Sequence, residues 1–199
     1  RADPNSARWG EGLYRFFLRA WPGELRHAFA AERARDRATG RPPWHNPFAA
    51  YLLGGLAFLA LALWLGGPVG LAWYLGLAAF AQLQLMTSDY VQHYGLRRET
   101  GPDGRPEPVR PRHSWNAPHW FSAALMLNAP RHSDHHAHPA RPYPALRLED
   151  DMPHLPYSLP VMACIALCPV HWRQLMDPLA AFMQNRMDGR PDDLPDWRP

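Results

Sequence analysis

The sequence contains no lysine, so all 21 of its basic residues are arginine. A genome rich in G and C produces this bias without any functional cause. The formal net charge is only +3, which is too small to predict a nucleic-acid partner. The arginines are concentrated within residues 1–41 and 97–113. Such concentrations are typical of the segments that flank membrane helices.

Cysteine is nearly absent, since only Cys164 and Cys168 occur. Two cysteines four residues apart define no disulfide framework. A CxxxC spacing without a second pair also argues against a structural zinc site. Because both cysteines lie in the apolar stretch 159–170, we expect small, buried side chains in a reducing compartment.

Charged residues are missing from residues 48–86. Residues 48–66 form one apolar run, which as a helix spans about 28 Å, close to the thickness of a bilayer core. A Gly-Gly-Pro turn at residues 66–68 precedes a second run at residues 69–86. We therefore predict an all-α integral membrane fold, with a transmembrane helical hairpin over 48–86 and cytoplasmic helices that carry histidines. The alternative is a buried hairpin in a soluble protein.

The arginines on either side of this hairpin predict its orientation. Arg37 and Arg41 precede the first run, and Arg97 and Arg98 follow the second. Both ends of a hairpin lie on one side of the membrane, and the positive-inside rule assigns that side to the cytoplasm.

The remaining segments give weaker signals. Residues 4–38 have helical periodicity, with Asn5 or Ser6 as N-cap and a kink or break at Pro22; this amphipathic segment suits a membrane surface or a soluble protein equally. We expect a loop over 99–112, a helix over 115–127, a short interfacial or packed helix over 159–170, and a disordered tail over 188–199. Residues 1–199 are interpreted as one partial domain.

Three histidines follow a metal-ligand pattern. His132, His135 and His136 have the i, i+3, i+4 spacing that places them on one helix face, where imidazoles can converge on an ion. Asp134 is placed to orient one of these ligands by accepting its second ring proton. The alternative is a solvent-exposed turn that happens to be rich in histidine.

His93 is the fourth candidate ligand. If the second apolar helix continues past Met86, His93 lies about 10 Å beyond the apolar run. Asp89 is one helical turn earlier, so we expect its carboxylate to bond to the His93 ring. A helix carrying the other three histidines could meet His93 at that depth.

The donor set alone leaves iron, zinc and copper open, because imidazole suits all three. The sequence has no HExxH motif of the kind found in zinc hydrolases, and its cysteines are not placed for blue copper. Iron that activates oxygen best explains a membrane location, since its substrates would dissolve in the bilayer.

Four segments resemble one known family. Residues 89–96 read DYVQHYGL, residues 111–116 read PRHSWN, and residues 131–137 read RHSDHHA, followed by RPY at 141–143. The opening, DPNSARWGEGLYRF at residues 3–16, is similar to a further family segment. In this order and spacing they resemble the membrane alkane 1-monooxygenases, relatives of xylene monooxygenase and the fatty-acid desaturases.

The resemblance implies a centre of two non-haem iron ions, with ligands at His93, His132, His135 and His136. It implies a supporting role behind the ligands for His113 in the HSWN element. It also implies two earlier histidine boxes, yet only His27 and His45 precede residue 89. We therefore expect a C-terminal fragment that is inactive by itself.

The family's activity is the O2-dependent hydroxylation of medium- and long-chain alkanes to 1-alkanols. The resemblance implies electrons from a rubredoxin and its NAD(P)H-dependent reductase. It also implies a multi-pass protein of the bacterial inner membrane with its active site facing the cytoplasm. An acidic donor could dock on Arg97, Arg98 and Arg112.

Three departures from the family pattern bear on this interpretation. Gln92 replaces a glutamate, Asp89 replaces an asparagine, and Pro130 replaces a glutamine. A proline at position 130 should kink the histidine helix or make it start afresh. A xylene-type monooxygenase, a fatty-acyl desaturase or hydroxylase, and a non-catalytic membrane metal-binding protein remain as alternatives.

Overall fold

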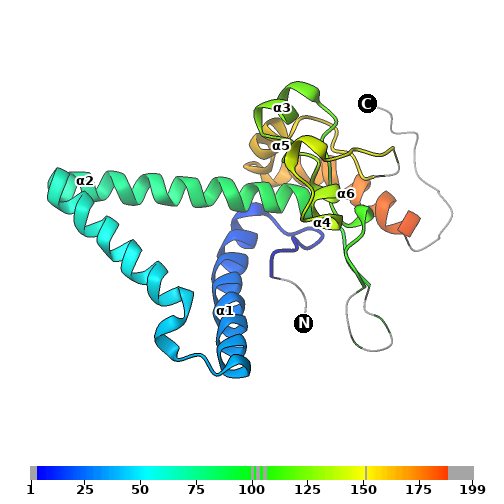
Figure 1. Ribbon diagram of the computed structural model, residues 1–199. Helices are drawn as coiled ribbons and strands as arrows, with labels where there is room; N and C mark the ends of the chain where they lie inside the picture. The colour runs from blue at the N-terminus through cyan, green and yellow to red at the C-terminus, as the bar shows by residue number, and fades with distance from the viewer. Residues whose placement is uncertain (1–3, 100, 102–103, 105–106, 151, 188–199) are drawn as a thin grey trace. The chain divides into compact units, whose positions relative to one another are not determined.

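A computed structural model describes residues 4–99, 101, 104, 107–150 and 152–187. Over these residues the secondary structure is helical, and the single β-bridge, between Asn116 and His154, belongs to no strand. The elements, shown in Figure 1, are α1 (Leu13–Thr39), η1 (Pro43–His45), α2 (Pro47–His93), η2 (Pro111–His113), α3 (Trp120–Leu125), α4 (His132–Ala137), η3 (Tyr143–Ala145), α5 (Leu159–Ala166) and α6 (Pro169–Met187).

The chain forms two compact units. One unit combines Arg1–Leu18 with Thr87–Pro199, and the other is Arg19–Met86. The first contains the four candidate ligands, and the second contains the predicted hairpin. The predicted tail at 188–199 lies outside the described residues.

Helix α2 is the one described helix long and apolar enough to cross a membrane. Its most apolar 18-residue window contains no buried residue. The helix is interrupted at Gly67, whose φ of 58° is in the left-handed region that favours glycine. Figure 1 shows two arms that diverge from this sharp bend. A side chain on Gly70 would lie 2.9 Å from the Ala62 carbonyl oxygen, so glycine is needed close to the bend.

The C-terminal arm of α2 continues to His93, as the position of the candidate ligand requires. The turn after the helix contains Gly95, which has a φ of 71°. The Gly95 N–H donates to the Ala7 carbonyl over 3.0 Å, and a Cβ at this position would lie only 2.7 Å from Ala180 Cβ. Glycine is therefore required here both for the turn and for the close packing.

Aromatic side chains form the core around the end of α2. Tyr90, Tyr94, Trp115 and Trp172 are fully buried. The Tyr90 ring centroid lies 5.1 Å from that of Trp172. The Trp115 indole donates to the Tyr94 carbonyl over 2.8 Å. Burial of these aromatic side chains stabilises the end of α2, next to His93.

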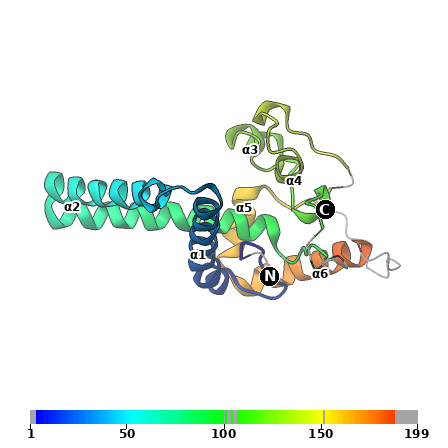
Figure 2. The same cartoon turned by 60° about the horizontal axis from the view of Figure 1, so that its bottom comes forward.

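Several predicted elements differ in detail. Helix α1 begins at Leu13 rather than near Ser6, and it passes through Pro22 as one helix. The helix predicted over 115–127 is only α3, Trp120–Leu125, because Leu127 and Asn128 adopt positive φ angles of 53° and 60°. The apolar stretch 159–170 divides into α5 and the start of α6, two helices in contact (Figure 2).

The prediction that Cys164 and Cys168 are buried is wrong. Both are free and exposed, because they lie on the outer side of the α5 region while Leu159, Met162 and Ala166 face the core. An apolar neighbourhood in sequence did not indicate burial here, since α5 is apolar on more than one face.

Candidate metal centre

Three imidazole nitrogens converge where the end of α2 meets α4. The Nε2 atom of His93 lies 3.2 Å from Nε2 of His136 and 3.3 Å from Nε2 of His132. The Nε2 atoms of His132 and His136 are 2.8 Å apart. An ion bound at about 2.1 Å from each nitrogen separates neighbouring ligand atoms by about 3.0–3.4 Å in octahedral or tetrahedral geometry. Two of the separations lie in this range and the third, 2.8 Å, is slightly shorter, so a small ring adjustment would fit the three nitrogens around one metal ion.

The ring of His93 is oriented by its own helix. Its Nδ1 lies 3.0 Å from the backbone carbonyl oxygen of Asp89, which can only accept a hydrogen bond. The Nδ1 proton is thus held by that carbonyl, and the lone pair on Nε2 points into the cluster. The predicted contact through the Asp89 carboxylate takes a different form, because that carboxylate accepts a hydrogen bond of 3.0 Å from the Asn5 amide.

His132 is held in the neutral form that binds metals. Burial, followed by the neighbouring His93, His136 and His135 rings, lowers the pKa of His132 to about 2. A neutral imidazole keeps a lone pair for a cation, whereas protonated rings at this spacing would repel one another.

His135 is not brought into the cluster. Its side chain is exposed, and its ring centroid lies 6.3 Å from that of His132 and 5.8 Å from that of His136. The group whose ligand atoms all lie within 4.8 Å of one another consists of His93, His132 and His136. His135 therefore stands at the edge of the site.

Asp134 does not orient a ligand imidazole, contrary to the prediction. Its buried carboxylate accepts hydrogen bonds from His138 Nδ1 at 2.9 Å, Arg141 Nη1 at 2.6 Å and the Arg147 N–H at 2.8 Å. Burial alone would raise the pKa of this carboxyl, but these donors together lower it below its ordinary value. Asp134 thus fixes the segment after α4, because the i+4 neighbour that it reaches is His138.

His113 belongs to a separate polar cluster. It is buried; its Nδ1 accepts the Arg110 N–H over 3.0 Å, so its Nε2 donates to Glu107 over 3.0 Å. Burial lowers the pKa of His113 in spite of the favourable Glu107 charge. Both ring nitrogens are therefore occupied, and His113 stabilises the turn before the HSWN element rather than reaching the three histidines.

A buried clamp on α4 was not predicted from the sequence. Asn116 is fully buried, and its amide donates to Ser133 Oγ at 2.6 Å and to the Pro153 carbonyl at 3.1 Å. The Ser133 N–H donates back to Asn116 Oδ1 over 3.0 Å, and Ser133 Oγ donates to the Ser114 carbonyl over 2.9 Å. Ser133 follows His132 directly, so the clamp fixes the first turn of the ligand helix.

The clamp is tied in turn to the end of α2. The Trp115 N–H donates to the Gln92 carbonyl over 2.8 Å, and the buried Gln92 amide donates to the Ala129 carbonyl over 3.1 Å. Gln92, the residue before His93, thus links the end of α2 to the segment before α4. Helix α4 starts afresh at His132, as predicted from Pro130. The sequence did offer a signal for this clamp. Asn116 ends the PRHSWN segment, and Ser133 directly follows the first ligand in RHSDHHA.

The chain is similar to known proteins over most of its length. The family model described as fatty acid desaturase matches residues 1–164. The chain is 39% identical over 178 residues to alkane 1-monooxygenase 1 of Pseudomonas aeruginosa, covering 88% of this chain and 47% of that protein. It is 39% identical over 177 residues to alkane 1-monooxygenase 1 of Alcanivorax borkumensis, with 88% and 44% covered.

A third relative is more distant. The hydroxylase component of a xylene/toluene monooxygenase from Pseudomonas putida is 29% identical over 181 residues, which covers 87% of this chain and 46% of that protein. The chain spans about half the length of the curated relatives it matches.

Proposed function

The chain belongs to the fatty acid desaturase family, and on that premise we propose that it is the histidine-bearing C-terminal part of an alkane 1-monooxygenase. The observation that carries the proposal is the convergence of His93, His132 and His136 on one point, in a chain similar to alkane 1-monooxygenases. The proposed substrates are medium- and long-chain alkanes, and the proposed products are 1-alkanols.

The donor set fits iron. Three imidazoles with no thiolate suit a non-haem iron site, and His135, whose ring centroid lies 5.8 Å from that of His136, is the proposed fourth ligand. Two iron ions, when bound, would supply the reductive activation of O2, with one oxygen atom inserted into a C–H bond and the other released as water. Three or four imidazoles are too few for two ions, so further ligands would come from another part of the protein.

The residues of this chain would set the position and protonation of the ligands. The Asp89 carbonyl holds the proton on His93 Nδ1. The clamp of Asn116 and Ser133 fixes His132 at the start of α4. A preformed ligand set costs little reorganisation when metal binds, which is the general benefit of such supporting residues.

The exposed apolar surface of α2 supports a location in the membrane. In the proposed arrangement, the two arms cross the bacterial inner membrane as a hairpin, the histidines face the cytoplasm, and alkanes arrive through the bilayer. The arginines at both ends of the apolar stretch support that orientation.

A rubredoxin, reduced by an NAD(P)H-dependent reductase, is the proposed electron donor. Of the three arginines considered for docking, Arg112 pairs with Glu107 at 2.6 Å, and Arg98 donates to the Glu107 carbonyl at 2.9 Å. Arg97 is exposed, which favours it as the docking charge. Arg97→Glu should slow electron transfer and weaken its dependence on salt, whereas unchanged rates would remove Arg97 from the docking surface.

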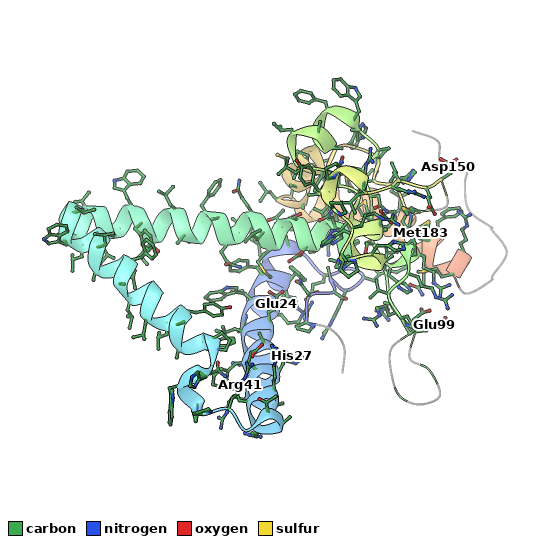
Figure 3. The ribbon with its side chains drawn as sticks, viewed as in Figure 1. Glu24, His27, Arg41, Glu99, Asp150 and Met183 are labelled. Carbon is green, nitrogen blue, oxygen red and sulfur yellow. The ribbon has the colours of Figure 1, made fainter. Side chains whose placement is uncertain are left out.

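Product analysis tests the proposed function. Cells that express the full-length protein with a rubredoxin system are fed octane and p-xylene together. We expect 1-octanol, lost on His136→Ala and kept on His27→Ala, because His27 is an exposed histidine of α1 far in sequence from the cluster (Figure 3). Methylbenzyl alcohol alone would move the assignment to a xylene-type monooxygenase. Binding of iron without any oxygenated product would favour a metal-binding protein.

A further inference from the structure

A second feature of the molecule lies in the other compact unit, just before α2 begins. A pocket of about 540 Å³ is lined by the C-terminal half of α1, by the Gly40–Arg41 segment and by η1. Three of its lining residues are Arg33, Arg37 and Arg41. Figure 3 labels Arg41 in the segment that joins α1 to α2.

The pocket has a surplus of positive charge. Its one acidic lining residue, Asp36, is buried and accepts a 2.6 Å hydrogen bond from the Asn46 amide. Within the part of the chain that the structure describes, no ion pair involves the guanidinium groups of Arg33, Arg37 or Arg41. Three positive groups and one negative group leave the pocket with a formal charge of about +2, facing solvent.

Apolar groups share the pocket with these charges. The Phe29 ring lines it, and the Arg33 guanidinium carbon lies 5.9 Å from the centre of that ring. Phe29 also packs edge-on against Phe48, with ring centroids 5.2 Å apart. Because Phe48 is in the first turn of α2, this contact fixes the arginines at the very start of the apolar helix.

Exposed aromatic residues flank the same place. Trp44, in η1, is 75% exposed, and Tyr51, in the first turns of α2, is 68% exposed. Trp and Tyr at the end of an apolar helix are typical of the level of lipid headgroups. Basic pockets at this level attract anionic headgroups, with each Arg or Lys contributing to the affinity.

From these contacts we propose that the pocket of Arg33, Arg37 and Arg41 binds the phosphate of an acidic phospholipid headgroup. The Phe29 face and Pro43 would contact the glycerol and upper acyl region, and the guanidinium groups would donate hydrogen bonds to the phosphate oxygens. The proposal rests on the membrane location of α2, which is part of the proposed function, but it requires no turnover.

The geometry favours a lipid over a protein partner. A docking surface for an acidic protein would present its charges on an open face, whereas these three arginines line a concave site next to apolar rings. The last lining residue, Asn46, directly precedes the helix that is long and apolar enough to cross a bilayer.

Native mass spectrometry of the purified full-length protein tests the proposal, with phosphatidylglycerol and phosphatidylcholine titrated into the detergent-solubilised sample. The pocket variant is Arg33→Gln/Arg37→Gln/Arg41→Gln. The matched control, Arg15→Gln/Arg26→Gln/Arg35→Gln, removes the same charge from α1 outside the pocket. A third variant, with lysine at the three pocket positions, keeps the charge and reports on folding.

We expect one tightly bound phosphatidylglycerol with little phosphatidylcholine. The pocket variant should weaken it by about 10- to 100-fold, the lysine variant by less than about tenfold, and the control variant by less than about threefold.

Equal losses in the pocket and control variants would overturn the proposal, and so would displacement of the lipid by millimolar inorganic phosphate. Unchanged lipid binding with slowed reduction by rubredoxin would assign the arginines to the electron donor instead. Bound lipid in a preparation that forms no octanol would leave this proposal standing while the proposed function failed.

Discussion

The unit that carries the histidines has a core of buried aromatic side chains, whereas the apolar helix exposes its tryptophans. Trp115 and Trp172 are at most 1% exposed, whereas Trp64 and Trp73 of α2 are 80% and 70% exposed. Monomeric soluble proteins rarely expose a continuous apolar surface of this kind. The difference is what we expect if lipid surrounds the arms of α2, while protein side chains cover the aromatic residues near the histidines.

The same two regions differ in their polar contacts. Around the histidines, buried polar side chains such as Asn116, Ser133 and Asp134 hold one another and the backbone in fixed directions. Along the arms of α2 the surface is apolar and needs no directional partner. Hydrogen bonds therefore fix the side chains around the histidines, whereas the placement of α2 depends on the length and hydrophobicity of its arms.

Removal of one ligand should have the largest effect. His132→Ala in the full-length protein should lower bound iron and octane hydroxylation by more than about 100-fold, because even residues behind a metal ligand are worth about 10- to 100-fold. Metal analysis and product formation are measured together. His45→Ala, an exposed histidine of the other unit, is the matched control and should retain both.

A charge placed in the apolar helix tests whether lipid surrounds α2. Leu56→Arg should disfavour membrane insertion by about 2.5–3.5 kcal/mol, since Leu56 lies near the middle of the first apolar arm. A glycosylation-mapping insertion assay measures this. Leu18→Arg, at a leucine of α1 that is 75% exposed against 53% for Leu56, should be nearly neutral. Equal, small effects would mean that water surrounds α2.

Loss of the clamp should loosen the ligand helix without removing a ligand. Asn116→Ala should destabilise the protein by about 2–3 kcal/mol, because it leaves the buried Ser133 N–H without its acceptor and removes the amide hydrogen bonds to Ser133 Oγ and the Pro153 carbonyl. Thermal unfolding and the iron dissociation constant report on it. Asn128→Ala, at a half-buried asparagine whose amide donates to the Tyr143 carbonyl, provides the comparison and should cost less, about 1 kcal/mol.

Acid should weaken the histidine-bearing unit more than the helical arms. Burial lowers the pKa of His113 in the folded state, so the unfolded chain takes up the proton more readily. The stability that His113 contributes is present above about pH 6.5 and is lost as the pH falls below that value, by at most about 1.4 kcal/mol per pH unit. Unfolding between pH 7.5 and 5.5 should depend less on pH in His113→Gln; identical pH profiles would contradict this.

The smallest effect is expected at the cysteines. Cys164→Ser and Cys168→Ser should each change stability by less than about 0.5 kcal/mol, because both side chains are exposed and free. Thiol labelling of the native protein should be rapid at both positions. Slow labelling would indicate that lipid or another part of the protein covers α5.

The sequence predicted the features that depend on local spacing. The apolar length of α2, the break at residues 66–68, the continuation to His93 and the fresh start of α4 after Pro130 all follow from neighbours along the chain. The pairing of His132 with His136 follows from their i, i+4 spacing.

The hydrogen-bond partners of the Asp89 and Asp134 carboxylates could not be predicted, because they depend on which distant segments of the chain pack against them. Asp89 bonds to Asn5, 84 residues away, and Asp134 bonds to Arg141 and Arg147 beyond its own helix. The position of His135 outside the cluster has a related cause. On a six-residue helix, the rotation that brings His132 and His136 to His93 turns the i+3 ring aside.

Iron K-edge X-ray absorption on the purified full-length protein is the most direct test of the central claim that His93, His132 and His136 bind iron. We predict a first shell of nitrogen and oxygen at about 2.1 Å with the multiple scattering of imidazole, and a loss of imidazole scattering in the His132→Ala and His136→Ala variants. An iron shell without imidazole, or one unchanged in both variants, would contradict it.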